Sequence, residues 1–134
     1  MTLYEECIYA LGEEIEILSS VEANNILISF KNTFPITKWG RVDWNKFNSF
    51  NKITSPDNIL EVIEKYDIDL NDSVYIIWDE VTLPIVKANL KRVLEVIVDI
   101  TAVSFNTWLF NPSSNYIIEF YHENEITFGK LVQK

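Results

Sequence analysis

The chain has 134 residues, the usual size of one domain built around a single hydrophobic core. Hydrophobic residues make up 48% of it, with only three glycines and four prolines, so disordered, collagen-like and low-complexity proteins are excluded. A net charge of −9 disfavours binding to nucleic acid or to an anionic membrane surface and favours a basic partner.

Two features of the sequence bear on location. No apolar run reaches the roughly 18 to 20 residues needed to span a bilayer. The N-terminal stretch MTLYEECIYALGEEIEI lacks the basic start and apolar centre of a signal peptide, so we expect a cytoplasmic protein. The single cysteine, Cys7, has no partner for an internal disulfide, and we expect it to be buried in packing rather than to be a reactive thiol.

The first element is predicted to be an amphipathic helix. Thr2 and Glu5 have the spacing of a capping box. Apolar residues then recur in alternating steps of four and three, at Tyr4, Ile8, Leu11, Ile15 and Leu18. Residues 24–31, NNILISFK, are rich in Ile and Phe and bounded by Asn, which predicts a strand.

Residues 31–54 combine Pro35 and Gly40, which interrupt regular structure, with several aromatic residues. We expect a hairpin or a long loop whose aromatic side chains cover the edge of the core. The same stretch interleaves basic and aromatic residues, so a second interpretation is a regulatory or single-stranded nucleic-acid-binding module acting through Lys38, Trp39, Arg41 and Trp44.

A second helix has clear start signals. Ser55 suits the N-cap, Pro56 the first helical position and Asp57 the first turn. The nearly continuous apolar run at residues 73–79, SVYIIWD, then predicts a buried central strand.

A third helix is predicted to begin at Pro84 and continue through residue 100. Its buried stripe would consist of Val86, Leu90, Val93 and Ile97. Alternation over residues 102–110 predicts a further strand, and if it ran parallel to the strand at 73–79, the crossover would be right-handed.

The chain closes with a predicted hairpin. Its strands are NYIIEFYH and EITFGKL, joined by a turn around Glu123 and Asn124. The whole order of elements favours a single α+β domain over residues 1–134, with a mixed, mostly antiparallel sheet of five or six strands and three helices packed against it.

Catalytic and metal sites find little support in the sequence. The only histidine, His122, has no second imidazole or thiolate near it in sequence, so we expect no metal site and no cofactor. No nucleophile elbow and no Gly-rich phosphate loop is present. A small enzyme using paired carboxylates remains an alternative if the fold brings Asp79 and Glu119 into one pocket.

Aromatic residues edged by carboxylates are the more informative group. In a strand, Glu119, Tyr121 and Glu123 would lie on one face, which would ordinarily be solvated. Together with neighbouring elements they suit a surface that binds a basic protein, because aromatic anchors supply affinity and charges supply steering. We expect the partner-binding residues to be Asp79, Glu80, Trp108, Glu119, Tyr121, His122 and Glu123.

The C-terminal half resembles a known family. It carries W-D-E before a helix-like segment that opens with L-P, an F-x-T-W strand and an E-F-Y-H turn, all within residues 74–129. These features resemble the bacterial immunity proteins of contact-dependent growth inhibition and related polymorphic toxin systems. The resemblance implies a protein without activity of its own, a monomer or a homodimer, that binds one cognate toxin C-terminal domain. Such toxins are commonly nucleases with basic surfaces.

Overall fold

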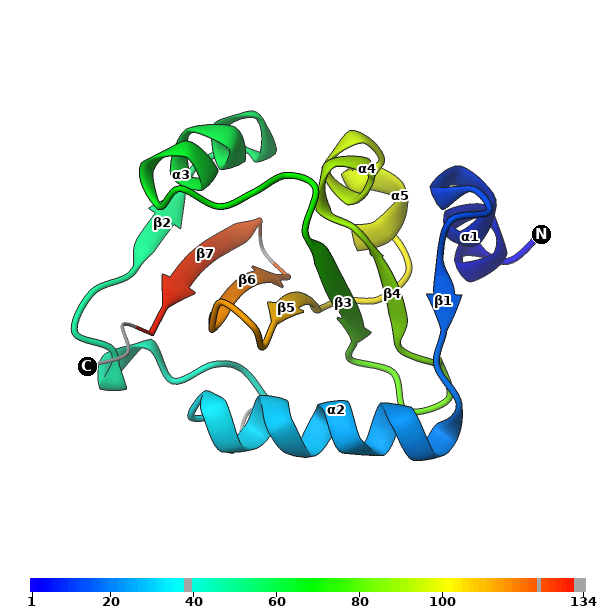
Figure 1. Cartoon of the computed structure of the whole chain (residues 1–134), viewed down its shortest axis with the longest axis horizontal. Coiled ribbons are helices and arrows are strands. Elements are labelled where there is room, and N and C mark those ends of the chain that lie inside the picture. Colours follow the sequence, from blue (N-terminus) through cyan, green and yellow to red (C-terminus); the bar gives the residue numbers. More distant parts are fainter. Residues whose placement is uncertain (38–39, 123, 132–134) are drawn as a thin grey trace.

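One antiparallel sheet of seven strands forms the centre of the protein, and helices cover both of its faces (Figure 1). The structure is a computed structural model that describes residues 1–37, 40–122 and 124–131. In spatial order the strands are β1-β4-β3-β5-β6-β7-β2. The prediction of an α+β fold with a mostly antiparallel sheet is confirmed, although the described residues form more strands and helices than expected.

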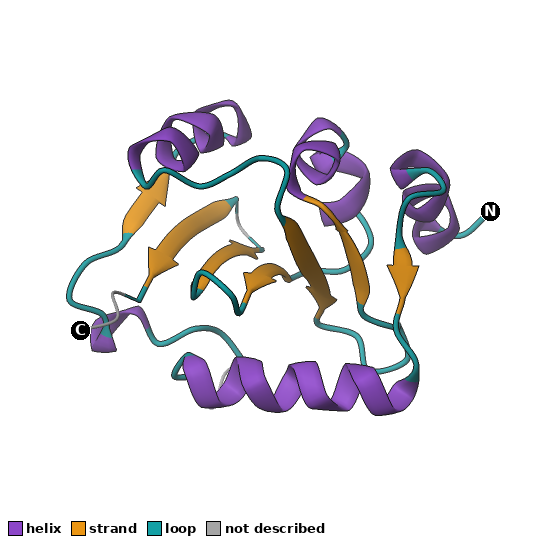
Figure 2. Cartoon of the chain, in the orientation of Figure 1, coloured by secondary structure: helices purple, strands orange, loops and turns teal. Residues whose placement is uncertain are grey.

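The strands are β1 (Glu16–Ile17), β2 (Asn51–Ile53), β3 (Ser73–Trp78), β4 (Val86–Asn89), β5 (Thr107–Asn111), β6 (Tyr116–Tyr121) and β7 (Glu125–Lys130). The α-helices are α1 (Leu3–Leu11), α2 (Ser20–Thr33), α3 (Ile59–Lys65), α4 (Leu90–Glu95) and α5 (Ile97–Thr101). Two short 3₁₀ helices, η1 (Trp44–Lys46) and η2 (Pro56–Asn58), complete the regular structure, which Figure 2 colours by type. None of the helices in the described ranges is long and apolar enough to cross a membrane.

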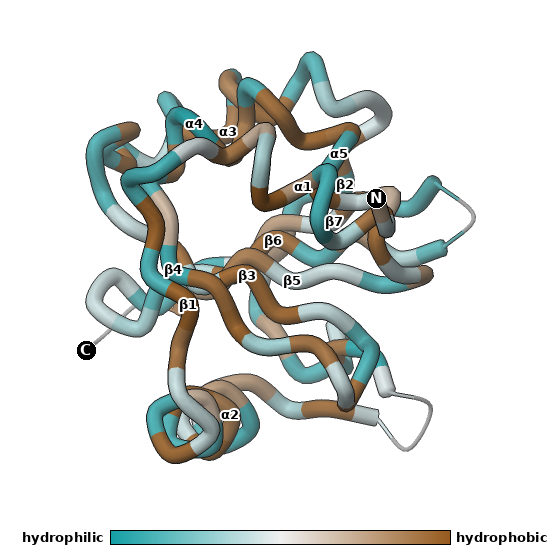
Figure 3. Tube along the Cα trace, turned by 90° about the vertical axis from the view of Figure 1, so that its right-hand side faces the viewer, coloured by the Kyte–Doolittle hydropathy of each residue, from teal (hydrophilic) through white to brown (hydrophobic). Residues whose placement is uncertain are grey.

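The sheet separates two hydrophobic cores. On one face, helices α1, α3, α4 and α5 pack over alternate residues of the central strands, among them Ile76, Leu109 and Ile118. On the other face, α2 and residues 34–37 and 40–47, which we call the segment 34–47, pack over the intervening residues, among them Ile77 and Ile117. Figure 3 shows α2 on its own, with the sheet between it and the other helices. Because both faces are covered, the central strands are apolar almost throughout.

The N-terminal elements differ from the prediction. The first helix ends at Leu11 rather than near Leu18, because Gly12 takes a φ of +88° and the chain turns into β1. The predicted strand at 24–31 is wrong, since these residues belong to α2. Ser19 caps that helix in a capping box with Glu22. The residues of this helix region that pack into the core recur at helical spacing, at Ala23, Ile26, Leu27, Phe30 and Phe34.

The third predicted helix is also shorter than expected. Residues 86–89 form β4, which pairs with β3 in antiparallel register, and the helix begins only at Leu90 with Asn89 as its N-cap. It breaks at Val96 into α4 and α5. The following strand, β5, begins at Thr107 and pairs antiparallel with β3, so the conditional parallel crossover does not arise.

The remaining elements agree with expectation. β3 confirms the buried central strand, and η2 with α3 begins at the predicted Ser55 cap. β6 and β7 form the predicted hairpin, closed by the pair Tyr121 and Glu125 with Asn124 at a φ of +63°. The described residues between α2 and η2 are mostly loop, apart from η1 and β2, which pairs with β7 at the edge of the sheet.

Candidate functional site

A buried carboxylate holds the α2 side of the molecule together. Glu119 on β6 is 0% exposed and lies beneath the segment 34–47. Its two oxygens accept hydrogen bonds from the Val42 backbone N–H (2.7 Å), Trp44 Nε1 (2.9 Å), Trp108 Nε1 (3.0 Å) and Arg41 Nη2 (3.2 Å). A buried charge requires such compensation, because removing it from water without partners is very unfavourable.

Glu119 and Trp108 therefore do not lie on a solvated face. Trp108 is only 7% exposed, and its ring meets Phe30 of α2 edge to face at 5.8 Å. The expectation that β6 presents Glu119 to solvent is wrong, because the segment 34–47 covers this side chain. These two predicted site residues support the surface from beneath, and Glu123 lies outside the described residues.

A row of partly to fully exposed side chains, each in contact with the next, lies beside this buried centre. The Arg41 guanidinium sits 4.1 Å from the centroid of the Tyr121 ring and pairs with Glu125 at 3.1 Å. The Tyr121 and His122 rings are 4.1 Å apart, and Phe105 meets His122 at 6.4 Å. We call Arg41, Tyr121, His122 and Phe105 the aromatic row. Its last member, Phe105, is 85% exposed.

Asn106 links the aromatic row to an acidic loop. Its Nδ2 donates to Asp79 Oδ2 at 3.0 Å, so its Oδ1 is the acceptor that receives the His122 backbone N–H at 3.0 Å. His122 Nδ1 lies 3.1 Å from the same Oδ1 and must therefore carry the proton. In the neutral ring, Nε2 is then left as an acceptor.

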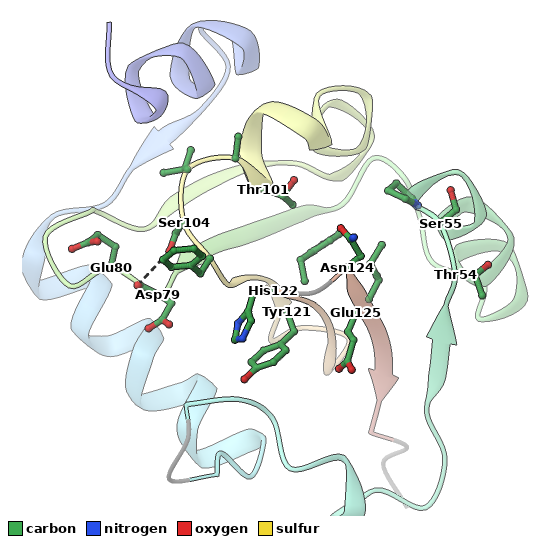
Figure 4. A pocket seen from close by; sticks show the side chains of 16 residues that line it. Thr54, Ser55, Asp79, Glu80, Thr101, Ser104, Tyr121, His122, Asn124 and Glu125 are labelled. Atoms are coloured by element: carbon green, nitrogen blue, oxygen red, sulfur yellow. Dashed lines mark hydrogen bonds between the residues drawn. The ribbon is translucent and has the colours of Figure 1, made fainter.

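The predicted residues Asp79, Glu80, Tyr121 and His122 come together around one cavity of about 780 Å³ (Figure 4). Figure 4 shows Asp79 and Glu80 at one side of it and Glu125 at the other, with His122 and Tyr121 between them. We call it the acidic cavity. Its charged and aromatic lining residues are Asp79, Glu80, Glu125, Phe105, Phe120, Tyr121 and His122, and the described residues that line it include no lysine or arginine.

Sequence reasoning did not identify Phe105, Asn106 or Arg41 as parts of this surface. Phe105 and Asn106 are the first two residues of the F-x-T-W segment and directly precede β5. The sequence signal for a surface role was an aromatic residue followed by a polar one. Arg41 was assigned to a different interpretation, because nothing local connects it to the closing hairpin.

The arrangement of these groups disfavours the alternative activities. Asp79 lines the acidic cavity, whereas Glu119 is not among its lining residues and makes all of its contacts inside the protein. Trp44 is 8% exposed and Arg41 is engaged by two carboxylates, so neither presents a stacking platform for nucleic acid; Lys38 and Trp39 lie outside the described residues. Across the described ranges, no group of three or more His, Cys, Asp or Glu could hold a metal ion.

Cys7 is not part of the acidic cavity or the aromatic row and lies in the core between α1 and the sheet. It is fully buried, as predicted. Burial raises the pKa of its thiol to about 11, with a smaller contribution from the charge of Asp99. A thiol held in its protonated form is a poor nucleophile.

Comparison with known proteins identifies the family. A search of the curated proteins finds no match to the chain. A family model described as "CdiI immunity protein EcoliA0-like" matches residues 1–129, which includes the N-terminal half that the sequence motifs did not cover. The chain therefore belongs to the EcoliA0-like family of CdiI immunity proteins, which are immunity proteins of contact-dependent growth inhibition.

Proposed function

We propose that this immunity protein neutralises the toxin domain of its own contact-dependent growth inhibition system by binding that domain in the cytoplasm. The contact surface is the rim of the acidic cavity. Asp79, Glu80, Tyr121 and His122 contact the toxin directly, while Trp108 and Glu119 hold the surface in shape from beneath. Glu123, which stands between β6 and β7 in the sequence, belongs to the proposed surface by its sequence position alone.

One observation supports this assignment above the others. The acidic cavity brings three carboxylates and the four aromatic rings of Phe105, Phe120, Tyr121 and His122 into one concave surface on the ends of the central strands. Aromatic anchors surrounded by charge are the composition of protein interfaces in which a few residues supply most of the affinity. Strands whose two faces are both packed provide a rigid support, so little conformational freedom is lost on binding.

The charge of the protein indicates the nature of the toxin. A domain of net charge −9 is attracted to a basic surface, and nucleases need such a surface to bind phosphates. We propose that the toxin is a nuclease, and that carboxylates of the immunity protein occupy positions where substrate phosphates would bind. Inhibition then requires no catalytic activity of the immunity protein, only a stable interface of roughly 1,600 Å².

Co-expression tests this function. The C-terminal domain of the toxin encoded beside this protein is produced in a sensitive cell with and without the immunity protein, and growth is followed. We expect growth only when both are present, and a stoichiometric complex on size-exclusion chromatography. Equal growth arrest in the two strains, with no complex, would contradict the proposal.

A further inference from the structure

We propose that the acidic cavity receives one arginine side chain of the toxin domain, stacked on the Phe105 ring and paired with the Asp79 carboxylate. This inference rests on the proposed function and specifies the chemical group that the surface recognises. It also names Phe105 as the principal aromatic contact.

The aromatic row already contains one guanidinium in such a setting. Arg41 stacks on Tyr121 at 4.1 Å and pairs with Glu125 at 3.1 Å. At the other end of the row, Phe105 and His122 stand beside Asp79 in a similar combination of rings and carboxylate. This end therefore resembles the first end in its rings and carboxylate. It holds no guanidinium from the described part of the chain, so the position of the cation is available to a partner.

Within the described ranges, the carboxylates at this end form no ion pair with a lysine or an arginine. Among the described residues, the Asp79 carboxylate accepts only the amide hydrogen bond of Asn106, and the Glu80 carboxylate accepts only the Thr82 hydroxyl at 3.2 Å. Among the described residues, the ion pairs involve other carboxylates, namely Glu119, Glu125 and Glu95. The contact with Asn106 fixes the orientation of Asp79, so the carboxylate is already in position when a cation arrives.

Two properties of the guanidinium group favour arginine over lysine at this site. A guanidinium is planar and stacks on an aromatic face, whereas an ammonium is a compact, strongly hydrated point charge. A guanidinium also presents several donors at fixed angles, which suits the carboxylate of Asp79 together with the acceptor Nε2 of His122. The cavity of about 780 Å³ lies within the range of about 300 to 1,000 Å³ that is typical of ligand pockets.

A titration that does not depend on the toxin tests the inference. The immunity protein is labelled with ¹⁵N and titrated with N-acetyl-arginine methylamide, and separately with N-acetyl-lysine methylamide, at low salt. We expect saturable shifts of the amide signals at Asp79, Phe105 and His122, with arginine bound at least about threefold more tightly than lysine. Equal affinity for the two compounds, or shifts outside this region, would overturn the inference.

Substitutions then identify the contacts. Asp79→Asn and Phe105→Ala each change an exposed side chain, so folding is expected to be retained, and each should weaken binding of the arginine compound about fivefold or more. Glu14→Gln removes the same charge from an exposed position between α1 and β1 and should leave binding unchanged. An equal loss in all three variants would contradict a defined site and indicate a general charge effect.

The same variants separate this inference from the proposed function. If Phe105→Ala and Asp79→Asn bind the toxin domain as tightly as the wild type while the wild-type protein still protects cells, the arginine site is wrong and the immunity function stands. If the arginine compound binds as expected but co-expression gives no protection, the proposed function is wrong and the site stands.

Discussion

Glu119 is the residue on which the α2 side of the molecule depends. Its carboxylate gathers donors from two chain segments, and one of them, Arg41, is 78 positions away in the sequence. The hydrogen bonds to this carboxylate stabilise the fold as long as every partner is present. Removal of any partner leaves a buried polar group unsatisfied.

Glu119→Gln should therefore destabilise the protein strongly. The amide keeps one acceptor oxygen but directs an NH₂ group toward donors, and it leaves the Arg41 guanidinium without its buried partner. We expect a loss of about 2 to 4 kcal/mol in the free energy of unfolding, measured by urea denaturation followed by tryptophan fluorescence.

Glu125→Gln provides the matched control. It makes the same chemical change on the other carboxylate that contacts Arg41, but the Glu125 side chain is 47% exposed. An exposed ion pair contributes at most about 1 kcal/mol. Equal losses of stability in the two variants would show that the burial of Glu119 is not what makes it important.

Cys7 should make stability depend on pH in the alkaline range. Its thiol has a pKa of about 11 in the folded protein and an ordinary value of 9.0. Below pH 9 the thiol is protonated in both the folded and the unfolded chain, and its contribution to the free energy of unfolding is fully present. Between about pH 9 and 11 only the unfolded chain releases the proton, so the free energy of unfolding falls as pH rises.

Comparison with Cys7→Ala isolates this effect from other titrating groups. Urea denaturation at pH 7.5 and at about pH 10.5 should show a decrease larger in the wild type than in the variant by about 1 to 3 kcal/mol. A parallel decrease in both proteins would mean that the thiol does not titrate differently in the two states.

At the scale of elements, the contact between β7 and η1 fixes the segment 34–47 against the sheet. Gly129 of β7 has no side chain where the ring of Trp44 passes, and a Cβ there would stand 2.4 Å from Trp44 Cζ3. The Trp44 indole also donates to Glu119, so the ring is held in place from both sides.

Gly129→Ala should force η1 away from the sheet. The displaced Trp44 ring would lose its hydrogen bond to Glu119, and we expect a loss of stability of about 1 to 3 kcal/mol with a change in tryptophan fluorescence. Wild-type stability together with an unchanged emission spectrum would contradict the close packing of this contact.

Elements with strong local signals were predictable from the sequence. The Ser55 cap, the apolar run of β3 and the hairpin of β6 and β7 all rest on residues close together in the chain. The predictions failed where residues outside the segment itself decide its structure. The run NNILISFK suits a strand locally, but the capping box at Ser19 and the packing of Phe30 place it in a helix.

The site was predictable only in part, for a related reason. Asp79, Glu80, Tyr121 and His122 stand in short segments whose aromatic and acidic composition was visible. The burial of Glu119 depends on Val42, which is 77 positions away, and no periodicity within β6 indicates that a distant loop covers one of its faces. Long-range pairing of this kind becomes visible only when the topology is known.

At the scale of the whole molecule, the charge of −9 is expected to govern the rate of association with the toxin. Steering by long-range attraction raises the association rate at low salt, and ions screen it over about 10 Å at 0.1 M ionic strength. We expect the association rate constant to fall at least about tenfold between about 20 mM and 500 mM NaCl, with a much smaller change in the dissociation rate. Stopped-flow fluorescence measures both, and an association rate independent of salt would rule out steering.

The central claim is that the acidic cavity is the toxin-binding surface. The most direct test is to measure the affinity of the cognate toxin domain for two charge-matched double variants. Asp79→Asn with Glu80→Gln removes two charges at the cavity, and Glu13→Gln with Glu14→Gln removes two in the turn between α1 and β1, which does not line the cavity. By isothermal titration calorimetry at physiological salt, the first variant should raise the dissociation constant by about tenfold or more, which corresponds to about 1.4 kcal/mol. The second should stay within about twofold of the wild type. Equal affinities for the two variants would contradict the claim.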